Sequence, residues 1–381
     1  MAAVATTYEL PPVTMLALVR DDTAADALLR AEALVAAGRH EDAATALEEL
    51  WENVRSDAAL AFRQRIALAW SELYRGELDR AEQLLAHAEG IARSARFDAA
   101  DRAEVLYRQG AVACQRNHVA EAVTLLTRAL ETNDGAPRPR NLLAARAYEW
   151  RARCHVSRSD WDAAVRDVER ALELAVRAGD EHTQAQALFQ ASIVAERRGE
   201  LLVARLNAEQ ALAIVRRHDN PLWVARVLNN LGGIDFLLGD AASAEEHLLG
   251  AIEAADAAGD DAALAQSVNS LAQIYLRTGR PVEARVRAQR AAEILDGRAD
   301  FLDELGNAQL AVARALLAEG DSAGATAWLD AADRTFDAFG SVSHRAAALV
   351  ARGDLVRALG DSDTAADLYR RAADSLQDVH F

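Results

Sequence analysis

Lysine is absent from this chain of 381 residues: all 42 of its basic residues are arginine. A phosphate-binding Walker loop and Schiff-base catalysis both need a lysine amine, so both are excluded. The arginine-only basic set, together with abundant alanine, indicates a bacterial genome of high GC content.

Aromatic residues, proline and cysteine are also scarce, at 5%, six and two respectively. This is the composition of helices packed through small side chains, and it predicts an all-α protein without strands. Cys114 and Cys154 have no CxxC spacing and no histidine at metal-ligand spacing, so we expect free thiols in a reducing cytoplasm. The sequence has no signal-peptide pattern and no long apolar run, which predicts a soluble, cytoplasmic protein.

The charge balance limits the partners. The net charge of −17 opposes binding to a phosphate backbone or an anionic membrane surface, so neither is expected as a direct partner. Histidines are scattered without an HExxH pattern, and no nucleophile has an evident base. We therefore expect no metal, no cofactor and no enzymatic activity.

A short phrase, Gly-Asp/Glu-x-x-x-Ala or a close variant of it, recurs nine times at intervals of 38 to 42 residues. Its starts are Gly38, Gly76, Asn117, Ser159, Gly199, Gly239, Gly279, Gly320 and Gly360. Each start can take the left-handed conformation that ends a helix, and the next helix follows at once. The phrase predicts the turn of an antiparallel helix hairpin.

Small residues recur at fixed places around each turn. Alanine stands five residues after every start and recurs seven residues later in eight of the repeats, and a small residue stands seven before most starts. Two helical turns separate the paired alanines, so they form one narrow stripe for close helix packing. Larger side chains on that stripe would overpack the hairpin at a cost of roughly 1–3 kcal/mol.

This pattern resembles the tetratricopeptide repeat, most clearly in Leu228–Ala251, LNNLGGIDFLLGDAASAEEHLLGA. The period near 40 is similar to that of kinesin light chains and of the sensor domains of bacterial activators and peptide receptors. The resemblance implies a right-handed α-α superhelical solenoid of about nine hairpins, continuous over residues 23–381, with a concave groove lined by the first helices. Residues 1–22, which contain Pro11-Pro12, are expected to be extended, along the solenoid or in its groove.

In that family, defined positions of each first helix face the groove. Counting back from each turn gives a polar, cationic set that suits an acidic peptide or helix. The candidate groove residues are Tyr107, Arg108, Arg146, Trp150, Arg153, Gln190, Arg226, Asn229, Asn230, Asn269, Gln273 and Arg314. Two plainer interpretations stay open: Asn229 and Asn230 bridge adjacent helices, and the arginines belong to a solvated or salt-bridged face.

The resemblance implies a non-catalytic adaptor or sensor, in bacterial signalling or transcriptional regulation, that binds a protein or peptide. The alternative is a structural scaffold that self-assembles as a homodimer through its last repeat, because the chain ends at Leu376, Val379 and Phe381 without a polar capping helix. A phosphatase-like regulator is a third alternative, for which no groove residue stands out.

Overall fold

The computed structural model describes residues 23–94, 96–218, 220–298, 301–340 and 342–376. Within these residues every regular element is helical, and the helices group into two compact units, 23–140 and 141–376. Each unit is described by itself. The predicted all-α class is confirmed, whereas continuity of one solenoid through both units stays a prediction, and the expectation for residues 1–22 falls outside the described residues.

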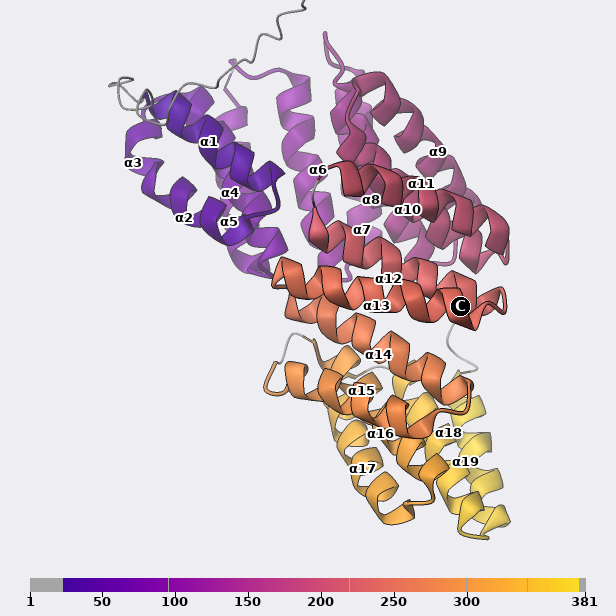
Figure 1. Cartoon of the computed structure of the whole chain (residues 1–381). Coiled ribbons are helices and arrows are strands. Elements are labelled where there is room, and N and C mark those ends of the chain that lie inside the picture. Colours follow the sequence, from indigo (N-terminus) through magenta and orange to yellow (C-terminus); the bar gives the residue numbers. More distant parts are fainter. Residues whose placement is uncertain (1–22, 95, 219, 299–300, 341, 377–381) are drawn as a thin grey trace, which may run out of the picture. The chain divides into compact units, whose positions relative to one another are not determined.

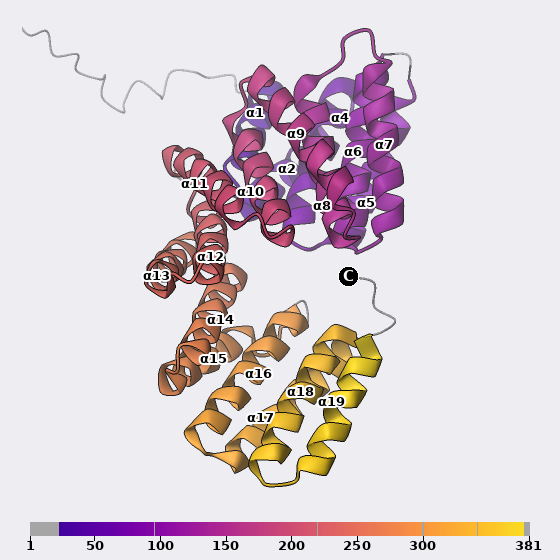
Figure 2. The same cartoon turned by 90° about the vertical axis from the view of Figure 1, so that its right-hand side faces the viewer.

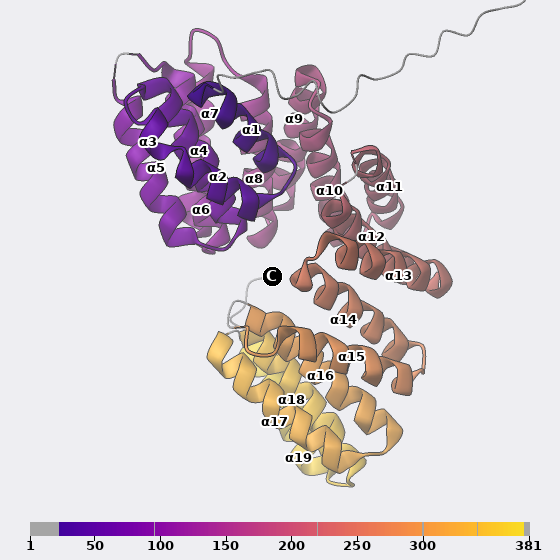
Figure 3. The same ribbon diagram turned by 60° about the vertical axis from the view of Figure 1, so that its left-hand side comes forward.

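Unit 1 contains three hairpins and one short additional helix, α3, after the first hairpin (Figure 3). Its helices are α1 (Ala24–Ala36), α2 (His40–Glu49), α3 (Trp51–Val54), α4 (Ala58–Tyr74), α5 (Leu78–Ala92), α6 (Ala99–Gln115) and α7 (Val119–Asp134).

Unit 2 contains six hairpins that follow one another in chain order, with the later ones lying side by side (Figures 1 and 2). Its first six helices are α8 (Asn141–Ser157), α9 (Trp161–Ala178), α10 (Glu181–Arg197), α11 (Leu201–Arg217), α12 (Pro221–Leu237) and α13 (Ala241–Ala258). The remaining six are α14 (Asp261–Arg277), α15 (Pro281–Leu295), α16 (Leu302–Glu319), α17 (Ser322–Phe339), α18 (Val342–Ala358) and α19 (Ser362–Leu376).

All nine predicted turns are present. Each starting residue has a positive φ, from 56° at Ser159 to 94° at Gly360. In each turn the N–H of the next residue donates to the carbonyl five residues earlier, as Asp240 N does to Asp235 O at 2.9 Å. This pattern satisfies carbonyls that the end of the first helix leaves open, and it fixes the direction of the second helix.

The small residues form the seam between the two helices of a hairpin. All nine alanines that follow the turns are at most 1% exposed. Where the first helix carries glycine, a side chain of the second helix fills the space beside it: a Cβ on Gly232 would lie 2.6 Å from Leu248 Cγ, and one on Gly353 would lie 2.5 Å from Tyr369 Cε1. Any side chain at these glycines would force the helices apart.

Ion pairs connect neighbouring repeats at the surface. Arg75 contacts Glu41 at 2.6 Å, and Arg280 contacts Glu245 at the same distance. Because these side chains are partly exposed, each pair contributes little to stability. They nevertheless show that many of the arginines serve to connect repeats.

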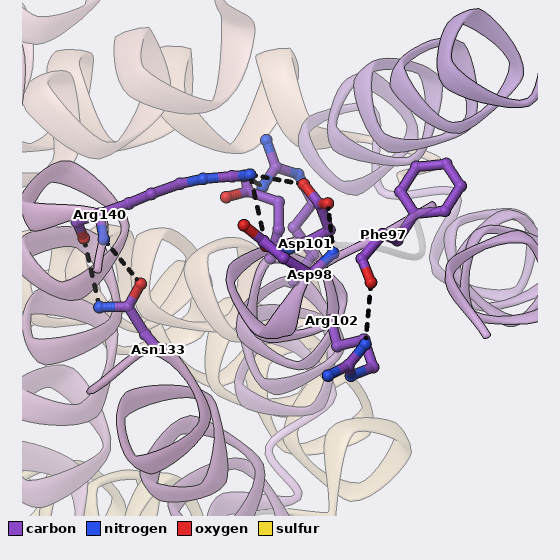
Figure 4. A network of polar contacts seen from close by, with 8 residues as sticks. Phe97, Asp98, Asp101, Arg102, Asn133 and Arg140 are labelled. Carbon is purple, nitrogen blue, oxygen red and sulfur yellow. Dashed lines mark hydrogen bonds and ion pairs between the residues drawn. The ribbon is translucent and has the colours of Figure 1, made fainter. Parts of the chain in front are cut away.

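The loop that follows α7 is held from both sides (Figure 4). Asn133 is 1% exposed, and its side-chain oxygen accepts the Arg140 N–H at 2.9 Å. The Arg140 guanidinium donates to Asp101 at 2.5 Å, beside Asp98 at the start of α6. This arginine is therefore engaged in closing the loop.

The last described helix turns a polar face outward. Its buried residues are Ala365, Leu368 and Ala372, and no large hydrophobic residue of 362–376 is among the exposed ones. A polar outer face is what a terminal repeat needs in order to cap a solenoid. Of the chain end proposed for self-assembly, Val379 and Phe381 lie outside the described residues.

Ser159 offers a direct test of the turn geometry, because serine disfavours its φ of 56°. The Ser159→Gly variant should raise the free energy of unfolding by roughly 0.5–1 kcal/mol, since glycine adopts this conformation without a steric penalty. The reciprocal variant Gly199→Ser, at a φ of 78°, should lower it by a similar amount. Urea denaturation measures both free energies. A lower unfolding free energy for Ser159→Gly would contradict the left-handed conformation assigned to residue 159.

Candidate functional site

The site is a pocket of about 300 Å³ in unit 2, formed by the first helices α10, α12 and α14 together with α13. Three consecutive hairpins therefore contribute to it. Its lining residues are Glu196, Asn229, Asn230, Gly233, Phe236, Leu237, Leu248, Ser270, Gln273, Ile274 and Arg277.

Apolar side chains from three helices line part of the pocket. Leu248 of α13 and Ile274 of α14 are 0% and 5% exposed, so they are fixed by the core. Leu237, at the end of α12, is 48% exposed. A partner's apolar side chain could therefore bury itself against Leu237, while Leu248 and Ile274 form the fixed wall behind it.

The amides of α12 supply the polar groups. The Asn230 side-chain oxygen accepts from Ser192 Oγ at 2.7 Å, and its amide nitrogen lies 3.4 Å from Glu196 Oε2. The bridging interpretation is thus correct for Asn230, which α10 holds in place. Asn229 differs, because its side-chain oxygen is buried and has no hydrogen-bond partner among the described residues.

Arg277 provides positive charge at the α14 side of the pocket. Its guanidinium carbon lies 4.4 Å from the centre of the Phe236 ring, and the side chain is exposed. Among the described residues no carboxylate lies within 4 Å of it. The pocket therefore has a stacked arginine on α14 and a carboxylate, Glu196, on α10.

Only three predicted groove residues line this pocket: Asn229, Asn230 and Gln273. Five others are buried, so their placement on an open surface was wrong. Their exposed fractions are 1% for Tyr107, 3% for Trp150 and Asn269, 6% for Gln190 and 9% for Arg108. Counting from the turn gave the helical phase, but neighbouring helices cover part of the face that this phase selects.

The other predicted arginines lie outside the pocket lining. Arg146 donates to Thr183 Oγ1 at 3.3 Å and lies 3.6 Å from Asp180, so the salt-bridged interpretation holds for it. Arg153 lies 4.2 Å from the Trp150 ring centre, and Arg226 lies 5.6 Å from that of Trp223. Arg314 is exposed on α16.

Glu196, Phe236 and Arg277 line the pocket but were not among the predicted groove residues. They lie within three residues of a turn, beyond the helix positions that the prediction used. One signal was available in the sequence: consecutive glycines, Gly232 and Gly233, inside a strongly helical pattern. A helix interior disfavours glycine, so such a pair requires a packing or functional reason.

A buried carboxyl lies on α8 of the same unit. Glu149 is 3% exposed, and burial raises its pKa above the usual 4.5, while the Arg153 charge and a hydrogen bond with Gln190 oppose the shift only in part. The predicted groove residues Gln190, which is buried, and Arg153, which is partly exposed, thus act on the carboxyl of Glu149.

No group of His, Cys, Asp and Glu side chains within the described ranges could hold a metal ion. The helices described are all too short or too polar to cross a membrane. Cys114 and Cys154 are not joined in a disulfide bond.

Comparisons with known proteins agree with the hairpin geometry. Residues 223–296, which cover most of α12 and all of α13, α14 and α15, match the family model described as tetratricopeptide repeat. This segment of the chain therefore matches tetratricopeptide repeats, as its turns and alanine stripes predicted. No curated protein matches it by sequence.

Solved structures with the same fold cover nearly the whole chain. The apo form of the quorum sensor NprR from B. thuringiensis has a TM-score of 0.69 at 14% identity, over 92% of this chain and 98% of that one. A Rap protein complexed with competence and sporulation factor scores 0.66 at 16% identity, over 92% and 97%. NprR in complex with its cognate peptide NprX scores 0.60 at 13% identity, over 94% and 100%. At these identities the likeness concerns the fold.

The raised pKa of Glu149 predicts a pH-dependent cost to stability. The folded protein holds this proton more tightly than the unfolded chain, so the cost is absent below 4.5 and grows as pH rises through the folded-state pKa. The Glu149→Gln variant should therefore have a higher unfolding free energy than the wild type at pH 7, and nearly the same one at pH 4.

Urea denaturation at several pH values measures this difference. Glu169→Gln, an exposed substitution on the neighbouring α9, is the matched control and should change stability by less than about 0.5 kcal/mol. If Glu149→Gln and the wild type had equal unfolding free energies at every pH, the burial cost assigned to Glu149 would be contradicted.

Proposed function

We propose that the chain is a non-catalytic sensor or adaptor whose unit 2 pocket binds an extended segment of a peptide or protein. The observation that carries the proposal is the unpartnered oxygen of Asn229 beside the fixed amide of Asn230. A buried polar atom without a partner carries a free-energy cost, and a ligand N–H would remove it. The backbone of an extended peptide supplies such N–H groups regardless of its sequence.

The remaining features of the pocket fit the same ligand. Leu237 offers an exposed apolar surface for a side chain, while Gln273 and Arg277 stand exposed on α14 for polar contacts. The net charge of −17 disfavours nucleic acid as the occupant. A peptide segment uses the apolar and the polar groups together.

The structural relatives support a regulatory setting for this binding. NprR, named as a quorum sensor, has been solved with its cognate peptide, and a Rap protein with competence and sporulation factor. By analogy with them, we place this chain in bacterial signalling or transcriptional regulation. Its output would then pass through another protein that responds to the occupied state.

The test compares two double variants of the full chain as immobilised baits in a lysate of the source organism. The site variant is Asn230→Ala with Arg277→Glu; the control, Asn207→Ala with Arg216→Glu, makes the same chemical changes on α11. Quantitative mass spectrometry of bound peptides and proteins should show at least one species that falls about tenfold or more with the site variant alone.

Equal retention of every species by both variants would contradict the proposed site. Circular dichroism checks that both variants keep their helical content, because Asn230→Ala also removes the hydrogen bond from Ser192.

A further inference from the structure

Gly233 is a helix-interior glycine that the fold does not explain. It lies in α12, four residues before the end of the helix at Leu237, and its side-chain position is exposed. A Cβ built on it would meet no atom within 4 Å, and its φ is not positive. The preceding Gly232 is the opposite case, because its Cβ would lie 2.6 Å from Leu248.

Glycine inside a helix lowers stability relative to alanine, so this residue carries a cost without a packing or backbone reason. The same position, six residues before the turn, is occupied by other residue types in the other eight repeats. They are Glu32, Trp70, Ala111, Arg153, Ile193, Gln273, Arg314 and Asp354. The missing side chain is therefore particular to the sixth repeat, which contributes most of the pocket lining.

The position of Gly233 within the pocket supplies the missing reason. Asn229 and Asn230 lie about one helical turn before it, Phe236 and Leu237 about one turn after it, and all five line the pocket. A longer side chain at residue 233 would enter the space that these residues surround.

The pocket carries opposite charges on its two sides. Glu196 stands on α10 and holds the Asn230 amide, whereas Arg277 stands on α14 without a carboxylate partner among the described residues. A ligand carboxylate is attracted to the α14 side and repelled from the α10 side.

We propose that Gly233 and Arg277 set the specificity of the pocket: the opening at Gly233 admits a large apolar side chain, and Arg277 pairs with a carboxylate adjacent to it. The inference rests on the proposed peptide-binding function. The carboxylate has two chemical sources, the C-terminus of a peptide or an Asp or Glu side chain within a segment.

The first measurement tests whether the fold needs a glycine at residue 233. Thermal unfolding of Gly233→Ala should show a melting temperature about 1–3 °C above that of the wild type, through helix propensity alone. A clear decrease would reveal a structural role for Gly233 and overturn the inference.

The second measurement uses bead libraries of random octapeptides as the probe, with the labelled full chain as receptor. One library carries a free C-terminal carboxylate and the other a C-terminal amide. The wild type should retain sequences with a large apolar residue next to a carboxylate. Retention confined to the free-acid library would identify the C-terminus as the carboxylate, and retention in both would identify an acidic side chain.

Two variants and one control complete the design. Gly233→Leu should weaken binding of the retained peptides at least tenfold. Arg277→Glu should reverse the charge preference, so that this variant retains peptides with basic residues in place of acidic ones. Gly90→Leu is the matched control on α5, where a Cβ also meets nothing within 4 Å, and it should bind like the wild type.

Different failures are distinguishable. The specificity assignment fails, while peptide binding stands, in either of two cases. In one, the retained peptides bind Gly233→Leu and the wild type equally tightly; in the other, they have no preference for an apolar residue next to a carboxylate. If the wild type retains no octapeptide from either library, the proposed function fails, and the specificity inference fails with it.

Discussion

The close approach of two helices across a seam of glycine and alanine is the contact on which the rest of this structure depends. It needs small residues on both helices and a left-handed residue between them, because only that turn sends the second helix back at contact distance. All nine repeats meet the second condition, seven with glycine and two with Asn117 and Ser159. With so few aromatic residues, the core is built mainly from alanine and leucine brought close by this geometry.

The same seam positions the pocket. Because Gly232 has no side chain, Leu248 of α13 packs directly against α12 and reaches the lining of the pocket beyond it. The adjacent Gly233 then leaves that space open toward solvent. Two consecutive glycines thus have different physical roles: the first brings the helices together, and the second keeps a surface uncovered.

The hairpins were predictable from the sequence because their signals are local. A turn residue and an alanine five positions on, followed in eight repeats by a second alanine seven residues later, lie within one stretch of chain, and the structure forms a hairpin at all nine turns. The pocket was less predictable, because it depends on which side chains the neighbouring hairpins cover. Trp150 and Asn269 have the helical phase of groove residues and are nevertheless buried. Arg277 lies outside the positions that the family resemblance selects, yet it lines the pocket through its stacking on Phe236.

The central claim is that ligands bind on the first helices of unit 2. Site-specific photo-crosslinking in living cells tests it most directly, with a photoreactive amino acid placed at Gln273 in the pocket or at the exposed Gln210 on α11. The account predicts that Gln273 yields a discrete adduct, whose peptide segment mass spectrometry identifies, and that Gln210 yields none of that mass. The same adduct at Gln210, or an adduct only there, would contradict it.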